Sequence, residues 1–326
     1  MELPTPCDMS STTDLCAPFS PWRCVTLEPN QLGESPFWDP REQTLYWVDI
    51  LGRQILRAHL AGAAIEHWDM PSEPGCIAPA AKGGLVLALR DGIYRGRQWG
   101  GPLERIATLD YDPAQMRAND GKCDALGRFW IGTLDETRAK HNAALYLIDG
   151  RAGGTPVIAR KTDPASLPAT TGNGLAWSPD GRILYWADTT AHVVHAWDFD
   201  APSATLTAQR LFHQFAPKPE LASATARYGG RPDGAAVDVQ GNYLVAMYEG
   251  RRVCKLAPDG ALLAEWTTPA QCPTMPCFGG EDLRTLYLTT ARQKRSAAEL
   301  EAMPLSGCVL STRVAVAGLP VNFFVD

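Results

Sequence analysis

Four side chains with oxygen donors stand at the same place in a pattern that recurs along the chain. They are Glu34, Asn119, Asn173 and Asp233, and each begins a segment in which a short apolar run, a turn and a second apolar run follow one another. Carboxylate and amide oxygens are the ligands that hard divalent cations prefer. A cation site therefore forms if the fold brings these positions together. The alternative is that each is only a turn residue, because Asn and Asp tolerate tight backbone geometry.

The pattern extends to six segments, and the two others begin at Cys76 and Met275. Eleven residues after each first residue the side chain is large and apolar, as expected of a core-facing strand position. These residues are Leu45, Leu87, Trp130, Leu184, Leu244 and Leu286. Eight residues after the first one, four segments have glycine, which is typical of a hairpin turn; these are Gly84, Gly127, Gly181 and Gly241.

Units of about 40–60 residues that each hold a few short strands are typical of the blades of a β-propeller. Helical periodicity is scarce, and its best candidate is SAAELEAM at residues 296–303. We therefore predict an all-β, six-bladed β-propeller; a β-sandwich would not require a repeat of this length. The propeller domain is expected over residues 21–326, with residues 306–316 as a candidate for the strand that closes the ring. Residues 1–20 are expected to form a flexible tail, because they are rich in Ser, Thr and Pro.

The first strand of a propeller blade lines the central channel, so the six first residues are expected to converge near the axis. Two carboxylates brought together there repel each other and raise each other's pKa unless a cation lies between them. Ca²⁺, Mg²⁺ or Mn²⁺ fits such oxygen donors better than a structural zinc. A water-filled channel without an ion is the alternative. Cys76 and Met275 are expected to pack beside the site and form an apolar wall.

The overall composition argues against several classes of function. A formal net charge of −6 gives no support to a nucleic-acid or anionic-membrane partner. No apolar run approaches the length of a membrane span, and the N-terminus lacks the basic and apolar regions of a secretory signal. The nine cysteines are odd in number and lack zinc-site spacing. We interpret them as free thiols in a reducing cytoplasm.

Several of these segments together resemble the SMP-30/gluconolactonase/regucalcin-like family. They are LGESPFWDPREQTLYWVDI, RANDGKCDALGRFWIGTL, TGNGLAWSPDGRILYWAD, RPDGAAVD and CFGG, and the resemblance runs from about Gln31 to GLPVNFF near the C-terminus. The resemblance implies a six-bladed propeller that binds one divalent metal near its axis and hydrolyses sugar lactones. The metal is one of Ca²⁺, Mn²⁺, Mg²⁺, Zn²⁺ and Fe²⁺.

By match to the family's motifs, Glu34, Asn173 and Asp233 correspond to the three protein ligands of the metal, and Asp233 also to the general base. Arg117 and Asn119 in RANDGK correspond to substrate-binding residues. The acidic substrate-binding side chain of the family falls in GTLDET, where Glu136 is the predicted residue and Asp135 the alternative.

The sequence predicts a metal-dependent hydrolase that opens a sugar lactone to the aldonic acid. A metal polarises the carbonyl and acidifies water, and Arg117 offers a planar fork of donors to hydroxyl groups or to the developing oxyanion. Ion pairing of Arg117 with Asp112 or Asp120 on the surface is an equally good interpretation. Two alternatives stay open for the whole chain. One is a calcium-binding or regulatory propeller without turnover, and the other is a lactonase or esterase for a non-sugar substrate. The oligomeric state is left open.

Overall fold

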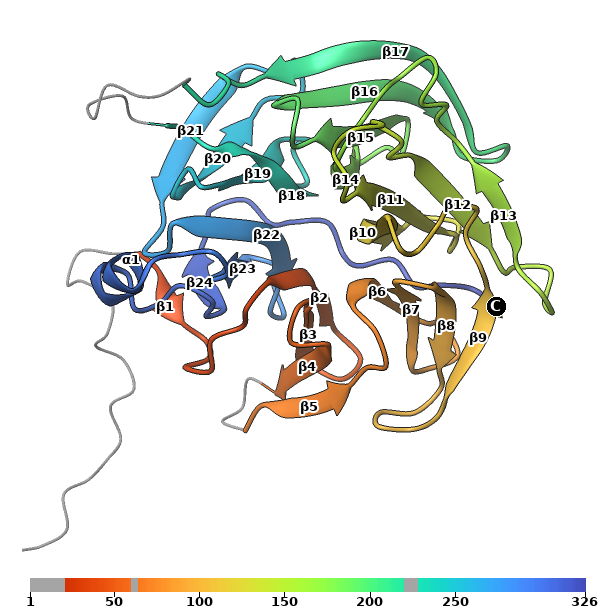
Figure 1. Cartoon of the computed structure of the whole chain (residues 1–326), viewed down its shortest axis with the longest axis horizontal. Helices are drawn as coiled ribbons and strands as arrows, with labels where there is room; N and C mark the ends of the chain where they lie inside the picture. The colour runs from red at the N-terminus through yellow and green to blue at the C-terminus, as the bar shows by residue number, and fades with distance from the viewer. Residues whose placement is uncertain (1–20, 60–63, 220–227) are drawn as a thin grey trace, which may run out of the picture.

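Six four-stranded antiparallel sheets form a ring around a central axis (Figure 1). The structure is a computed structural model, and it describes residues 21–59, 64–219 and 228–326. The predicted all-β, six-bladed propeller is confirmed. The predicted tail, residues 1–20, lies outside the described residues, so the domain boundary at residue 21 stays a prediction. Within the described part of the chain, no helix is long and apolar enough to cross a membrane.

Each blade is an up-and-down sheet whose strands follow one another outward from the axis. Blade 1 consists of β2 (Gly33–Asp39), β3 (Thr44–Asp49), β4 (Gln54–His59) and β5 (Glu66–Asp69). Blade 2 consists of β6 (Pro74–Pro79), β7 (Leu85–Leu89), β8 (Gly92–Gly96) and β9 (Leu103–Ala107). Blade 3 consists of β10 (Met116–Cys123), β11 (Phe129–Asp135), β12 (Leu145–Asp149) and β13 (Val157–Arg160). Blade 4 consists of β14 (Gly172–Trp177), β15 (Ile183–Asp188), β16 (Val193–Asp200) and β17 (Thr205–Gln214). Blade 5 consists of β18 (Arg231–Val237), β19 (Tyr243–Tyr248), β20 (Arg252–Leu256) and β21 (Leu262–Thr267).

Blade 6 closes the ring with strands from both ends of the described chain. It consists of β22 (Cys272–Gly279), β23 (Thr285–Ala291), β24 (Leu310–Arg313) and, outermost, β1 (Arg23–Cys24). The segment predicted to close the ring therefore contributes the third strand of this blade, and the short N-terminal β1 adds the fourth. The predicted helix is α1 (Ala297–Ala302), in the β23–β24 connection, with Ser296 as its N-cap.

The hydrophobic core lies between neighbouring blades rather than at the axis. One buried cluster joins blades 2 and 3, and another joins blades 3 and 4. The six apolar positions of the repeat are all buried, which confirms their predicted place in the second strand of each blade. Full burial of a leucine side chain stabilises the fold by about 1.5–3 kcal/mol. The four repeated glycines all have positive φ angles, between +67° and +84°, as a hairpin turn requires.

The innermost strand of every blade contains a β-bulge, where its register with the second strand shifts. In β2 the shift lies between Glu34 and Phe37, and in β14 between Asn173 and Ala176. A bulge bends a strand and re-aims the side chains beside it. The six bulges therefore form a layer around the axis at which the direction of the channel-lining side chains changes.

The C-terminal segment 318–326 crosses one face of the disc (Figure 1). Leu319 N–H donates to Val237 O of blade 5 at 3.2 Å, and Phe324 N–H donates to Pro79 O of blade 2 at 2.8 Å. Val325 N–H donates to Gly127 O of blade 3 at 2.9 Å. The segment thus ties together blades on opposite sides of the ring and covers one end of the central channel.

Candidate functional site

The four predicted oxygen donors line one cavity at the end of the channel where the innermost strands begin. The cavity has a volume of about 220 Å³, and Arg117 also lines it. Glu34 and Asn173 directly precede the bulges of β2 and β14, whereas Asn119 and Asp233 lie within the bulges of β10 and β18. The bulges thus turn side chains from four different blades toward one space.

A chain of hydrogen bonds fixes the two amides. Arg117 Nη1 donates to Asn119 Oδ1 at 2.8 Å, and Asn119 Nδ2 donates to Asn173 Oδ1 at 2.6 Å. Asn173 Nδ2 donates to Thr189 Oγ1 at 2.7 Å. Asn173 Oδ1 accepts one hydrogen bond, from Asn119, and keeps a second lone pair for a ligand in the cavity.

The two carboxylates are buried, and neither forms an ion pair with any residue that the structure describes. Burial raises the pKa of Glu34 well above its usual value, and the negative charges of Asp233 and Asp120 add to this shift. Burial, followed by the charge of Asp120, raises the pKa of Asp233 in the same way. Arg117 and Arg231 act on these carboxylates only at longer range, because among the described residues they form ion pairs with other acids.

This environment fits a divalent cation. Buried carboxylates with raised pKa values need a positive charge to remain ionised, and Glu34, Asp233 and the oxygen of Asn173 supply a hard donor set of formal charge −2. Within the described ranges, no three His, Cys, Asp or Glu side chains gather as a metal cluster. That finding is consistent with the predicted ligand set, which contains only two carboxylates and has the amide oxygen of Asn173 as its third ligand.

Asp120, next to Asn119 in the β10 bulge, lies close enough to the two carboxylates for its charge to raise their pKa values. Its Oδ2 accepts a hydrogen bond from Leu175 N–H at 2.8 Å, while its Oδ1 is buried and has no hydrogen-bond partner in the described part of the chain. Burial raises the pKa of Asp120, and the charge of Lys122 opposes this shift. The third negative charge increases the electrostatic demand for a cation in the cavity.

Arg117 is buried and pairs with neither of the surface partners weighed from the sequence. Its Nε lies 3.6 Å from Glu136 Oε1, and Glu136 also pairs with Arg90 at 2.8 Å. Glu136 is not among the described residues that line the cavity, whereas its partner Arg117 is. The alternative acid, Asp135, caps a turn by accepting from Thr137 N–H at 3.0 Å. Arg117 therefore lies at the site, whereas Glu136 contacts Arg117 but does not line the described cavity.

The prediction that Cys76 and Met275 form an apolar wall of this site was wrong. In blades 2 and 6 the bulge has a single unpaired residue, Gly75 or Thr274, and Cys76 and Met275 follow it in regular strand pairing. Cys76 is fully buried in the core between blades 2 and 3. Met275 lines a second cavity at the opposite end of the channel.

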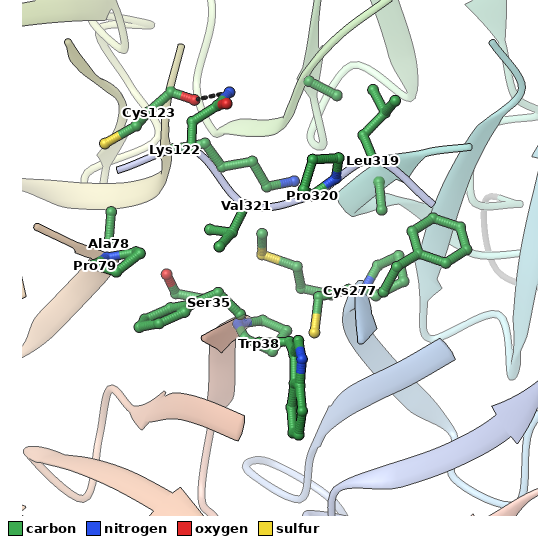
Figure 2. Close-up of a pocket in the computed structure, with 18 of the residues that line it drawn as sticks. Ser35, Trp38, Ala78, Pro79, Lys122, Cys123, Cys277, Leu319, Pro320 and Val321 are labelled. Carbon is green, nitrogen blue, oxygen red and sulfur yellow. Dashed lines mark hydrogen bonds between the residues drawn. The ribbon is translucent and has the colours of Figure 1, made fainter. Parts of the chain in front are cut away.

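That second cavity is lined mainly by apolar side chains (Figure 2), has a volume of about 130 Å³ and is bordered by the C-terminal segment. Lys122 extends into it, and its Nζ donates to Ala235 O. Burial lowers the pKa of Lys122. Asn322 Nδ2 donates to Cys123 O at 3.1 Å and holds the C-terminal segment against β10.

Sequence reasoning missed several charged residues that line the first cavity. They are Arg138, Arg231, Glu249, Lys294 and Arg295. A signal for one of them was present, because Arg231 stands two residues before Asp233 as Arg117 stands two residues before Asn119. The others lie in connecting segments after the second strands of blades 3, 5 and 6, where no repeat marks them.

Comparisons with known proteins agree with this fold. The sequence profile of the SMP-30/gluconolactonase/LRE-like region matches residues 32–292. A 6-deoxy-6-sulfogluconolactonase of Pseudomonas putida is 40% identical over 302 residues, which cover 93% of this chain and 98% of that protein. Regucalcin of Danio rerio is 33% identical over 91% of this chain and 96% of its own length.

Solved structures show the same fold. A calcium-binding protein, regucalcin, from Agrobacterium tumefaciens superposes with a TM-score of 0.82 at 24% identity, over 92% of this chain and 96% of that one. A gluconolactonase from Xanthomonas campestris superposes with a TM-score of 0.66 at 23% identity, over 90% and 89% of the two chains. With the profile match and the two closely similar sequences, the conclusion is that this chain belongs to the SMP-30/gluconolactonase/LRE-like family.

Proposed function

We propose that this protein hydrolyses a sugar lactone to the corresponding aldonic acid in a metal-dependent reaction at the polar cavity. Family membership and the 40% identity to a gluconolactone-type lactonase over nearly the whole chain support the predicted enzyme class, a lactonase. The structural observation that carries the proposal is the convergence of Glu34, Asn173 and Asp233, from three blades, in a cavity that Arg117 also lines.

Glu34, Asn173 and Asp233 would hold one divalent ion. Such an ion polarises a carbonyl and lowers the pKa of water. Among candidate ions, Ca²⁺ has the support of relatives named regucalcin, one of them described as calcium-binding. Mn²⁺, Mg²⁺, Zn²⁺ and Fe²⁺ accept the same oxygen donors, and the choice among them is an experimental question.

Residues of this chain then carry out proton transfer and substrate binding. A carboxylate oxygen of Asp233 accepts the proton of the attacking water, whose oxygen bonds to the carbonyl carbon. The ring C–O bond breaks, and the same proton passes to the departing ring oxygen, so that the aldonic acid carries both fragments of water. Arg117 donates to hydroxyl groups of the sugar or to the oxyanion, and Glu136 holds Arg117 in place. Asn119 Nδ2 already donates to Asn173 Oδ1 and Gly172 O, so Asn119 contacts a sugar hydroxyl through its Oδ1 as acceptor.

Five buried cysteines are free thiols: Cys76, Cys123, Cys254, Cys272 and Cys277. This supports a reducing compartment and, with it, the proposed cytoplasmic location.

The proposal is tested by following acid release from a panel of γ- and δ-aldonolactones near neutral pH, above the spontaneous background. Asp233→Asn keeps the shape of the side chain and removes the basic carboxylate, so turnover should fall by about 10²–10⁴-fold. Lys161→Met, at a partly exposed position in the connection after blade 3, serves as the control and should keep native turnover.

Two other results would redirect the proposal. Turnover of non-sugar lactones or esters alone would leave a hydrolase with a different substrate. Background rates on every lactone, together with tight calcium binding by calorimetry, would favour a calcium-binding propeller without turnover.

A further inference from the structure

The wall of the polar cavity carries more positive than negative side chains. The cations are Arg117, Arg138, Arg231, Lys294 and Arg295, and the acids are Glu34, Asp233 and Glu249. A divalent ion at the proposed ligands would increase the positive excess. An excess of one sign of charge in a cavity attracts ligands of the opposite sign. A positive excess is unexpected for an enzyme whose substrate is a neutral sugar lactone.

Three of the five cations lie on the side of blades 5 and 6. There Glu249 is shared by three cations. Its carboxylate lies 3.4 Å from Arg231, 3.2 Å from Arg295 and 3.1 Å from Lys218. Arg295 has a second acid, Glu299, at 3.5 Å. Even with both acids counted, three cations face two carboxylates, so neutralisation of Glu249 does not account for all of them.

Lys294 adds a further cation beside this group. Within residues 21–59, 64–219 and 228–326 it has no ion pair or side-chain hydrogen bond, and it is exposed. Its backbone has a positive φ of +57°. A lysine in this conformation is uncommon, and Lys294 is one of the residues that line the cavity.

The position of this group suits the far end of a bound sugar. Arg231 stands two residues before Asp233 on β18, and two strand residues span about 7 Å. That distance is comparable with the length of one sugar ring and its exocyclic carbon. Arg117 and Asn119 lie on the side of blade 3 and are left to contact the hydroxyl groups.

We propose that the substrate is an anionic sugar lactone, with a sulfonate, phosphate or carboxylate on the carbon remote from the lactone carbonyl, and that Arg231, Lys294 and Arg295 bind this anion. The inference rests on the proposed function and names its substrate class. The name of the Pseudomonas putida relative, which specifies a sulfo group on carbon 6, supports it. Arginine and lysine bind these oxyanions through charge-assisted hydrogen bonds.

The first experiment compares kcat/KM for glucono-1,5-lactone with kcat/KM for its 6-sulfonate, 6-phosphate and 6-carboxylate counterparts at low and high salt. At least one anionic lactone should exceed the neutral one by about tenfold or more, with an advantage that shrinks as salt screens the charges. The best of the three identifies the anion. Equal or better turnover of the neutral lactone would overturn the anion subsite and leave the lactonase proposal intact.

Two substitutions locate the subsite. Lys294→Met and Arg231→Met each remove one charge-assisted contact, so each should lower the ratio of anionic to neutral kcat/KM by about 10-fold or more. Arg284→Met removes an exposed cation from the β22–β23 turn, on the face of the disc opposite the cavity, and should leave the ratio unchanged. If the ratio of anionic to neutral kcat/KM is unchanged in both cavity variants, the assignment of the anion subsite is contradicted.

A binding measurement keeps the inference testable without turnover. Calorimetry with 6-phosphogluconate and gluconate compares two stable acids that differ only in the second anion. The native protein should bind the phosphorylated acid at least about tenfold more tightly, and Lys294→Met should remove most of that difference. Equal affinities would refute the subsite. If no lactone is hydrolysed but the difference in affinity is present, the proposed function fails while the anion site stands.

Discussion

The two ends of the central channel are built from the same innermost strands, yet they differ in almost every chemical property. At one end the strands present Glu34, Asn173 and Asp233 to a polar cavity. Three or four residues further along, the same strands present Trp38, Trp177 and Ala236 to a cavity with mostly apolar walls. The bulges lie between the two sets and separate them.

This difference shows that each innermost strand has two roles: one end stabilises the closed ring, and the other end carries the residues of the proposed site. Apolar side chains near the C-terminal segment stabilise the closed ring, whereas the buried carboxylates of the polar end oppose folding until a cation compensates them. Lys122 is the exception, because it places a charge in the apolar end. Substitutions at the two ends should therefore separate turnover from stability.

The largest effect is expected at the polar end. Glu34→Gln removes one of the two ligand charges while preserving size, so kcat/KM should fall by at least about 100-fold, in line with the loss of an electrostatic group at a reacting centre. Because burial of the Glu34 carboxylate is costly, the free energy of unfolding of the metal-free protein should not decrease. The measurements are lactone hydrolysis and chemical denaturation in chelator. Native turnover in this variant would remove Glu34 from the site.

Next in size is a change within the bulge layer. Gly174 has a φ of +60°, and a Cβ there would lie 2.2 Å from Tyr243 Oη, which donates to Gly174 O at 2.7 Å. Gly174→Ala should lower the free energy of unfolding by about 2–4 kcal/mol and displace the neighbouring Asn173, which lowers turnover as well.

Its matched control is Gly181→Ala. Gly181 has a similar φ of +68°, but a Cβ there meets nothing within 4 Å. The control should cost only about 1 kcal/mol and keep native turnover. Equal losses in the two variants would show that backbone strain, and not crowding of the bulge layer, sets the effect.

Lys122→Met tests whether the apolar end is independent of the reaction. The substitution keeps the length of the side chain but removes the hydrogen bond to Ala235 O and the charge that opposes burial of Asp120. We expect a loss of about 1–3 kcal/mol in the free energy of unfolding and turnover within threefold of native. A loss of turnover comparable with that of Glu34→Gln would mean that the two ends are coupled through Asp120.

The smallest effect is expected from Met275→Leu, a change of similar volume in the wall of the apolar cavity. The free energy of unfolding should change by less than about 1.5 kcal/mol, with native kcat and KM. Thermal unfolding and steady-state kinetics check both values. A clear change in KM would return Met275 to the active site, where the sequence had placed it.

The features that could be predicted from the sequence are those that repeat. Leu45 and its equivalents mark the second strands, Gly181 and its equivalents mark the turns, and together they predict six blades. Glu34, Asn119, Asn173 and Asp233 could be placed together because polar residues recur at one position of that repeat.

The features that could not be predicted depend on local geometry or on long-range pairing. The bulges of blades 2 and 6 have one unpaired residue instead of two, and Cys76 and Met275 follow them in regular pairing, outside the lining of the polar cavity. The two-residue strand β1 has no periodicity of its own and pairs with β24 only because the ring must close. Lys294 and Arg295 reach the cavity from a connection outside the repeat.

The most direct test of the account is a titration of metal-stripped protein with a divalent ion, in which bound ion and lactone turnover are measured on the same sample. The account predicts one ion bound per chain and turnover that rises in proportion to it, with both lost in Asp233→Asn and both retained in Met275→Leu. Turnover that persists at the native rate in the stripped protein, with no ion bound, would contradict it.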